Sequence, residues 1–247
     1  MIIVYGSRFY GRIRQCGSSF LATKFVHIYF VPLIPIGSHL VFEENGDGSY
    51  RGVAAPFSFK SVMAGYLRVW GPLAIILTGV LTAGAVDDLS DDPLAMLIAG
   101  GFGGLVGLAL LAGVILAYAV MGKLSTTEKQ QRAVYALHSG YYVDPAELGD
   151  ARHSLREDLI EKIRARARGL SAMGYRVSAD PAQAWPHIAM DPTQNDEAFI
   201  TAAFTLARLD GSLAQGPYKT HMEQVHAHLW QRISRSNAPY LHAVLQA

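Results

Sequence analysis

Two long runs of uncharged, apolar residues dominate the middle of the chain, at 69–86 and 93–122. A helix rises about 1.5 Å per residue, so about 20 apolar residues cross a hydrocarbon core of about 30 Å. The first run just reaches this length, and we expect the longer second run to tilt or to extend beyond the bilayer. The link at 87–92 carries four aspartates and allows only a tight turn. The pattern predicts an integral membrane protein with a helical hairpin at 60–122, whose spans lie at about 67–86 and 93–121.

The charges that flank the two runs predict the orientation of this hairpin. Lys60 and Arg68 come before the first run, and Lys123 and Lys129 follow the second, whereas the link between the runs has no basic residue. Basic flanks stay on the cytoplasmic side of a membrane. We therefore expect a protein of the plasma (inner) membrane with both termini in the cytoplasm.

The second run repeats small residues at helical spacing. Small residues let helices approach closely in lipid, where apolar side chains gain nothing by leaving lipid for one another. Such a stripe serves either self-association or packing against the first run of the same chain. Because small residues occur on more than one face of the run, we predict a homo-oligomer. The predicted interface consists of Ala95, Ala99, Gly103 and Gly107.

Neither run contains an Asp, Glu, Lys, Arg or His. Ion-coupled transporters and voltage sensors need ionisable groups inside the membrane, so the runs argue against active transport. A pore formed by an oligomer and closed by an apolar constriction stays open as an alternative.

The segment before the hairpin, 1–59, has the pattern of a small β unit. Residues 1–5, 25–31 and 38–43 are rich in β-branched and aromatic residues, and 45–48 reads Asn-Gly-Asp-Gly, a strong turn signal. Two prolines at 32 and 35 predict a corner after a buried strand.

The string at 30–37, Phe-Val-Pro-Leu-Ile-Pro-Ile-Gly, resembles the F-x-P-L-I-P-x-G linker of small bacterial zinc-ribbon domains that precede membrane segments. In that family a C-x-x-C-G knuckle precedes the linker and a second knuckle follows it. Here Ile13 stands in place of the first cysteine of the first knuckle, Cys16 in place of its second, and 42–46 contains no cysteine. The resemblance, which covers 12–46, implies a ribbon-like β fold that has lost its metal.

Tetrahedral zinc needs four nitrogen or sulfur ligands, and this chain offers a single cysteine. A rebuilt site would need Cys16 together with His27 and His39, but no pair of these residues has knuckle spacing. We therefore predict no metal and no other cofactor.

The C-terminal part, 123–247, has helical periodicity and repeated helix signals. Ser125 and Ser154 each begin a capping box, and Gly140, Gly169 and Gly211 are the predicted helix ends. Gly216-Pro217 opens a further helix, and Trp185 is assigned to a proline-flanked loop in which it closes a small core. We predict a cytoplasmic helical bundle whose helices each bury one apolar face.

Several basic residues are placed where anionic lipid headgroups could reach them, because a tethered domain stays close to the membrane. Cations at the end of a helix also suit its dipole, and the alternate spacing of the basic run at 162–168 splits its charges between faces, which favours a solvated helix end for this run. The candidate headgroup contacts are Arg68, Lys123, Arg164 and Arg168.

The net charge of +1 gives no overall attraction to nucleic acid. No phosphate-binding loop, nucleophile elbow or dinucleotide fingerprint occurs in the sequence. The pattern favours a non-enzymatic membrane scaffold or adaptor that self-associates, contacts the lipid bilayer and presents cytoplasmic surfaces to a protein partner. An oligomeric channel is the alternative, and a membrane-tethered enzyme with a site assembled from dispersed residues is the weakest of the three.

Overall fold

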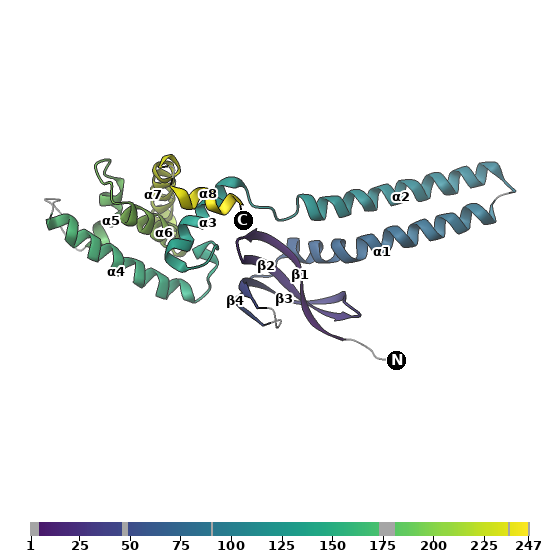
Figure 1. Cartoon of the computed structure of the whole chain (residues 1–247), viewed down its shortest axis with the longest axis horizontal. Helices are drawn as coiled ribbons and strands as arrows, with labels where there is room; N and C mark the ends of the chain where they lie inside the picture. Colours follow the sequence, from purple (N-terminus) through teal and green to yellow (C-terminus); the bar gives the residue numbers. More distant parts are fainter. Residues whose placement is uncertain (1–4, 46–48, 90, 173–180, 237, 247) are drawn as a thin grey trace. The chain divides into compact units, whose positions relative to one another are not determined.

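A computed structural model describes residues 5–45, 49–89, 91–172, 181–236 and 238–246 (Figure 1). The chain forms two compact units. The first, here called the anchor unit, comprises Met1–Gln15, Phe20–Val41 and Ala54–Lys123. The second, the helical unit, comprises Cys16–Ser19, Phe42–Val53 and Leu124–Ala247.

The N-terminal strands form a four-stranded antiparallel sheet in the order β1-β2-β3-β4. This confirms the predicted β character, although residues 1–4 of the predicted first strand and 46–48 of the predicted turn lie outside the described residues. The strands are β1 (Tyr5–Cys16), β2 (Ser19–Ile28), β3 (Val31–Glu44) and β4 (Tyr50–Ala55).

The predicted proline corner is wrong, because Pro32 and Pro35 both lie within β3. The register between β2 and β3 shifts next to each proline, where Pro35 lies opposite Phe25 and Pro32 opposite His27. The pairing skips Ile36 and Leu33, which adjoin the two prolines, and such bulges are places where a strand tolerates proline. The strand therefore continues through both prolines.

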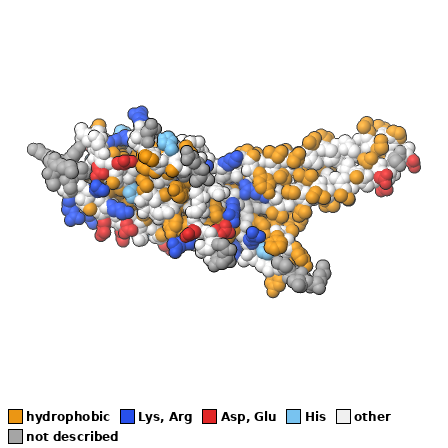
Figure 2. All heavy atoms as spheres, in the orientation of Figure 1, with side chains coloured by type: hydrophobic (Ala, Val, Ile, Leu, Met, Phe, Trp, Pro, Cys, Tyr) orange, Lys and Arg blue, Asp and Glu red, His pale blue; other side chains and the backbone are white. Residues whose placement is uncertain are grey.

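The two apolar runs form the helices α1 (Phe59–Asp88) and α2 (Pro93–Ala119), which lie side by side. Both helices are long and apolar enough to cross a membrane, and almost none of either apolar stretch is buried within the protein. Hydrophobic side chains cover much of this hairpin, and acidic side chains lie at its far end (Figure 2). The side chain of Ser58 accepts a hydrogen bond from the backbone of Ser61, and Asp92 caps α2 in the same way.

The C-terminal part is mostly helical, as predicted. Its helix α6 is the core of the helical unit, because its large side chains, among them Phe199, Phe204 and Leu206, are fully buried. The elements are α3 (Thr126–Ser139), η1 (Pro145–Glu147), α4 (Ala151–Ala172), α5 (Pro181–Met190), α6 (Glu197–Leu213), α7 (Gly216–Arg235) and α8 (Pro239–Gln246).

Helix α3 has both predicted ends, a capping box at Ser125 and a left-handed Gly140. Two predicted boundaries of α4 and one of α6 are wrong. Ser154 lies inside α4, which begins at Ala151, and α4 continues through Gly169. A glycine inside a helix costs only about 1 kcal/mol relative to alanine, so it does not have to end one.

Helix α6 continues past Gly211 to Leu213. Gly211 is buried, and a Cβ at this position would lie 3.4 Å from the Cβ of Met222 on α7. Glycine there permits close packing of the two helices. Trp185 belongs to α5 and not to a loop. Its ring is nevertheless buried, at 2% exposure, as predicted for a tryptophan that closes a small core.

Candidate functional site: the junction of sheet and hairpin

A chain of buried hydroxyl groups seats the first turns of α1 on the sheet. Ser61 donates to the carbonyl of Gly11 on β1 over 2.8 Å, and Thr23 on β2 donates to Ser61 over 2.9 Å. The backbone N–H of Ser58 donates to Ser38 on β3 over 2.9 Å. These hydroxyls connect three strands to the helix, and each is satisfied without water.

Gly11 makes this contact possible. Its φ is +64°, and a Cβ built there would overlap the carbonyl oxygen of Ser61. Glycine adopts left-handed backbone at no steric cost and lets another backbone approach closely. The sheet and α1 therefore meet backbone to backbone at this point.

Arg68 joins β1, α1 and α2. Its Nη1 donates to the carbonyl of Arg12 over 2.7 Å, while Nε and Nη2 donate to the carbonyl of Ala117 over 3.2 and 2.8 Å. The Tyr118 hydroxyl donates to the carbonyl of Arg68, and the Tyr118 ring lies 5.3 Å from the guanidinium carbon. The planar guanidinium is suited to holding several acceptors in one fixed geometry.

The chain leaving α2 is attached to the same strand. The backbone N–H of Arg14 donates to the carbonyl of Gly122 over 2.6 Å. Gly122 has a φ of +73°, and a Cβ there would overlap Ile13. Both ends of the helical hairpin are thus fixed to β1.

Two aromatic side chains of α1 hold the beginning of β3. The Tyr66 hydroxyl donates to the carbonyl of Leu33 over 2.6 Å, and the Trp70 indole N–H donates to the carbonyl of Pro32 over 2.9 Å. Tyr66, Arg68 and Trp70 lie at the edge of the first apolar run, where aromatic and basic residues are typical of a membrane interface. That position does not indicate that all three side chains donate to backbone carbonyls.

The predicted self-association stripe faces the partner helix of the same chain along part of its length. Ala95, Ala99, Gly103 and Gly107 are all partly buried. A Cβ built at Gly103 would overlap the side chain of Thr82 on α1, whereas a Cβ at Gly107 would meet nothing within 4 Å. Gly103 is therefore a packing position inside the hairpin, and Gly107 is a small residue with room beside it.

The four predicted headgroup contacts do not form one cluster within a unit. Arg68 is engaged at the junction, and Lys123 is exposed at the end of the anchor unit. Arg164 and Arg168 are exposed on α4 of the helical unit.

His27 and His39 cannot share a metal ion. His39 lies opposite Ala22, and His27 lies further along β2, so five residues of strand, or about 16 Å, separate them. Among the described residues, no group of three His, Cys, Asp or Glu side chains could hold a metal ion. Cys16 is buried beside Ala133, and burial raises the pKa of its thiol.

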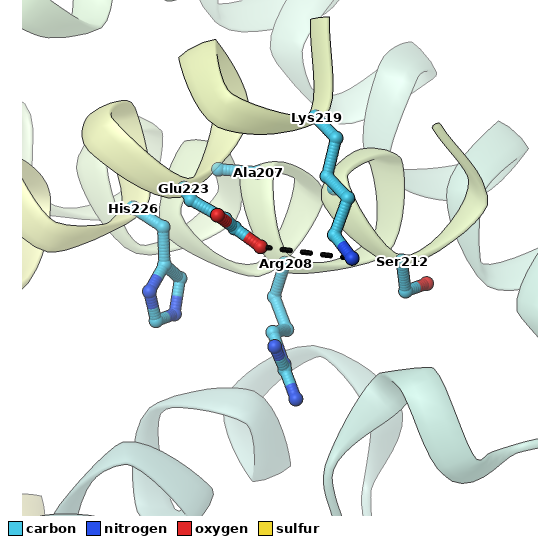
Figure 3. Close-up of a pocket in the computed structure, with 7 residues that line it drawn as sticks. Ala207, Arg208, Ser212, Lys219, Glu223 and His226 are labelled. Atoms are coloured by element: carbon cyan, nitrogen blue, oxygen red, sulfur yellow. Dashed lines mark ion pairs between the residues drawn. The ribbon is translucent and has the colours of Figure 1, made fainter. Parts of the chain in front are cut away.

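The helical unit has a shallow pocket of about 180 Å³ between α6 and α7 (Figure 3). Its charged side chains already have protein partners. Arg208 forms a bidentate pair with Asp144, and its guanidinium points away from the other labelled side chains. Lys219 lies 4.0 Å from Glu223, one turn further along α7. These partners account for the charged groups of the pocket.

His226 also lines this pocket and is held neutral. Burial and the nearby Arg208 lower its pKa to about 4, although Asp144 opposes the shift. Its Nε2 lies 2.8 Å from the Tyr135 hydroxyl, whose pKa burial raises. Burial opposes ionisation of Asp144, but the hydrogen bonds and charge of Arg208, together with the backbone N–H of Ala146 and the charge of Arg132, lower its pKa. The cluster stabilises the packing of α3, α6 and α7.

Comparisons of the chain with protein-family models, with curated proteins and with solved structures found no match.

Proposed function

We propose that this protein is a non-enzymatic scaffold or adaptor of the plasma (inner) membrane. In this proposal α1 and α2 cross the bilayer, the sheet lies at the cytoplasmic membrane surface, and the helical unit presents a cytoplasmic surface to a protein partner. The acidic link between the helices then faces the outside, and both termini are cytoplasmic.

One observation carries the proposal: the two ends of an apolar hairpin are fixed to a single strand. Arg68 binds the carbonyls of Arg12 and Ala117, and Gly122 accepts from Arg14. Such an attachment transmits position and force between a membrane anchor and a sheet. The polar groups at the junction are used in contacts within the protein, which is the arrangement expected of a structural part.

The orientation rests on the basic residues beside the junction. Arg68 and Lys123 lie at the sheet end of the two helices, whereas the described part of the link carries only acidic charges. Basic residues near the ends of a span favour the cytoplasmic side.

Self-association through α2 is part of the proposal, and two glycines one turn apart allow a sharp test. A Cβ at position 107 meets nothing within 4 Å in the hairpin of one chain, so we expect Gly107→Ile to act mainly on a contact between chains. Gly103→Ile collides with Thr82 and disturbs the hairpin itself. Close contacts between helices in lipid are worth roughly 1–2 kcal/mol each, enough to shift an oligomer equilibrium about tenfold.

The measurement is the native mass of the full-length protein in mild detergent. We expect an oligomer for the wild type and a shift toward the monomer for Gly107→Ile, with the thermal midpoint unchanged. Gly103→Ile should lower the midpoint as well. A monomeric wild type would remove self-association, and an oligomer that Gly107→Ile leaves intact would move the interface away from this face of α2.

A further inference from the structure

The turn between β2 and β3 exposes large apolar side chains. The segment 25–36 contains no Asp, Glu, Lys or Arg. We call residues 28–36 the apolar tip. Its exposed members include Ile28, Tyr29, Phe30, Leu33, Ile34 and Ile36, with Ile34 at 63% and Phe30 at 56% exposure. Large exposed apolar side chains gathered at one turn in this way mark an interaction site.

The turn itself carries aromatic residues in a conformation that they rarely adopt. Tyr29 and Phe30 have φ values of 48° and 67°, and together they form the two-residue link between β2 and β3. Hairpin turns with two positive φ values favour Asn-Gly. Strained residues of this kind persist when the surrounding structure holds them, and they cluster at functional sites. Here the Tyr10 hydroxyl donates to the carbonyl of Phe30 over 2.7 Å.

Two hydrogen bonds fix the direction in which the apolar tip points. Tyr66 of α1 binds the carbonyl of Leu33, and Trp70, one turn further along α1, binds the carbonyl of Pro32. Moving along α1 from Tyr66 to Trp70 therefore corresponds to moving along β3 from Leu33 to Pro32, toward the turn between β2 and β3. Tyr29 and Phe30 lie beyond Pro32 in this direction, so the turn extends along α1 past the level of Trp70.

We propose that the apolar tip inserts into the lipid bilayer beside α1, in the leaflet that the sheet faces. This inference rests on the proposed membrane location of α1 and α2. The apolar surface of the tip is continuous with that of α1 at Trp70, a residue type typical of the membrane–water interface. The occupant is therefore lipid: the side chains of the tip meet the region where headgroups join the acyl chains.

The backbone of the tip limits how deep it goes. Polar backbone groups must be paired inside the hydrocarbon core, and β2 and β3 pair with each other as far as Ile28 and Val31. The four-stranded sheet is open, with β1 and β4 at its edges, so the tip reaches the interfacial region and not the bilayer centre.

Lipid contact can be measured with an environment-sensitive fluorophore on single cysteines in a full-length Cys16→Ala background. The probe sites are Ile34→Cys in the tip, Val80→Cys in the middle of α1, and Glu43→Cys at the other end of β3. The proteins are reconstituted in vesicles of phosphatidylcholine and phosphatidylglycerol. Nitroxide-labelled lipids carry the quencher either near the headgroup or near the chain end.

We expect the Ile34 probe to emit at shorter wavelength than the Glu43 probe and to be quenched more by the shallow nitroxide. The Val80 probe should be quenched more by the deep nitroxide. The Glu43 probe should be quenched by neither. An unquenched Ile34 probe beside a quenched Val80 probe would overturn the inference and leave the membrane location standing. A blue-shifted but unquenched Ile34 probe would assign the tip to a protein contact instead. An unquenched Val80 probe would overturn both the membrane location and this inference.

A matched variant separates lipid contact from folding. Tyr29→Asn with Phe30→Gly supplies the residues that this turn favours and removes both aromatic rings. We expect the thermal midpoint to stay the same or rise, while quenching of the Ile34 probe by the shallow nitroxide falls. Unchanged quenching in this variant would contradict insertion of the turn.

Discussion

Two histidines of the helical unit, His138 and His226, make it sensitive to acid. Burial lowers the pKa of each from 6.5 to about 4, with Lys162 adding to the shift at His138 and Arg208 at His226. His138 lies 3.2 Å from the Thr201 hydroxyl, and His226 lies 2.8 Å from that of Tyr135. Both rings are therefore neutral in the folded protein at pH values where they would be charged in the unfolded chain.

The free energy of unfolding should consequently fall as the pH falls from about 6.5 to about 4, because the unfolded state binds protons that the folded state rejects. Each histidine contributes a slope of at most about 1.4 kcal/mol per pH unit in this window. Asp144, whose pKa is lowered from 3.8, loses its stabilising effect only at still lower pH. Denaturant unfolding followed by tryptophan fluorescence measures the slope. His138→Gln with His226→Gln should flatten it, and an equally steep slope in that double variant would contradict the assignment.

Residue types at the junction could be predicted from the sequence, but their contacts could not. Tyr66, Arg68 and Trp70 follow from their position at the edge of an apolar run. Their acceptors are the backbone carbonyls of Leu33, Arg12 and Pro32. Every residue has a backbone carbonyl, so the sequence does not show which one accepts. The same holds for Phe30, whose exposure depends on where β2 turns.

At the scale of elements, the close approach of β1 to α1 at Gly11 is the critical contact. Gly11→Ala would place a Cβ against the carbonyl of Ser61 and force an unfavourable φ, at a cost of about 2–3 kcal/mol or more. Gly37→Ala is the matched control on β3, because its Cβ would lie 3.8 Å from the nearest atom, on His39. Thermal unfolding in detergent should show a clear loss for Gly11→Ala and little change for Gly37→Ala. Equal midpoints for the two variants would mean that sheet and hairpin are not held together at this point.

The elements that follow strong local signals were the predictable ones. Hydrophobic runs gave α1 and α2, and a capping box with a terminal glycine gave α3. The errors arose where tertiary structure overrides a local signal, as at Pro32 and Pro35, which bulges accommodate within β3. Gly211 is another case, since α6 uses it for close packing against α7 and does not end there.

At the scale of the whole molecule, the sequence suggested a β unit, a hairpin and a bundle in series. The structure groups most of the sheet with the hairpin in the anchor unit. The reason is the set of hydrogen bonds from Ser61, Arg68 and Trp70, which join segments up to 56 residues apart along the chain. Periodicity and capping describe neighbours in sequence, so they carry no information on such contacts.

The central proposal is that α1 and α2 cross the membrane with the sheet and the helical unit on the cytoplasmic side, and cysteine labelling in intact cells tests it most directly. In a Cys16→Ala background, Asp91→Cys reports on the link between the helices, and Ser234→Cys reports on an exposed position of α7. An impermeant thiol reagent should label Asp91→Cys in intact cells and Ser234→Cys only after the membrane is permeabilised. Labelling of Ser234→Cys alone would reverse the orientation. Labelling of both or neither in intact cells, with both accessible after permeabilisation, would contradict the membrane-spanning hairpin.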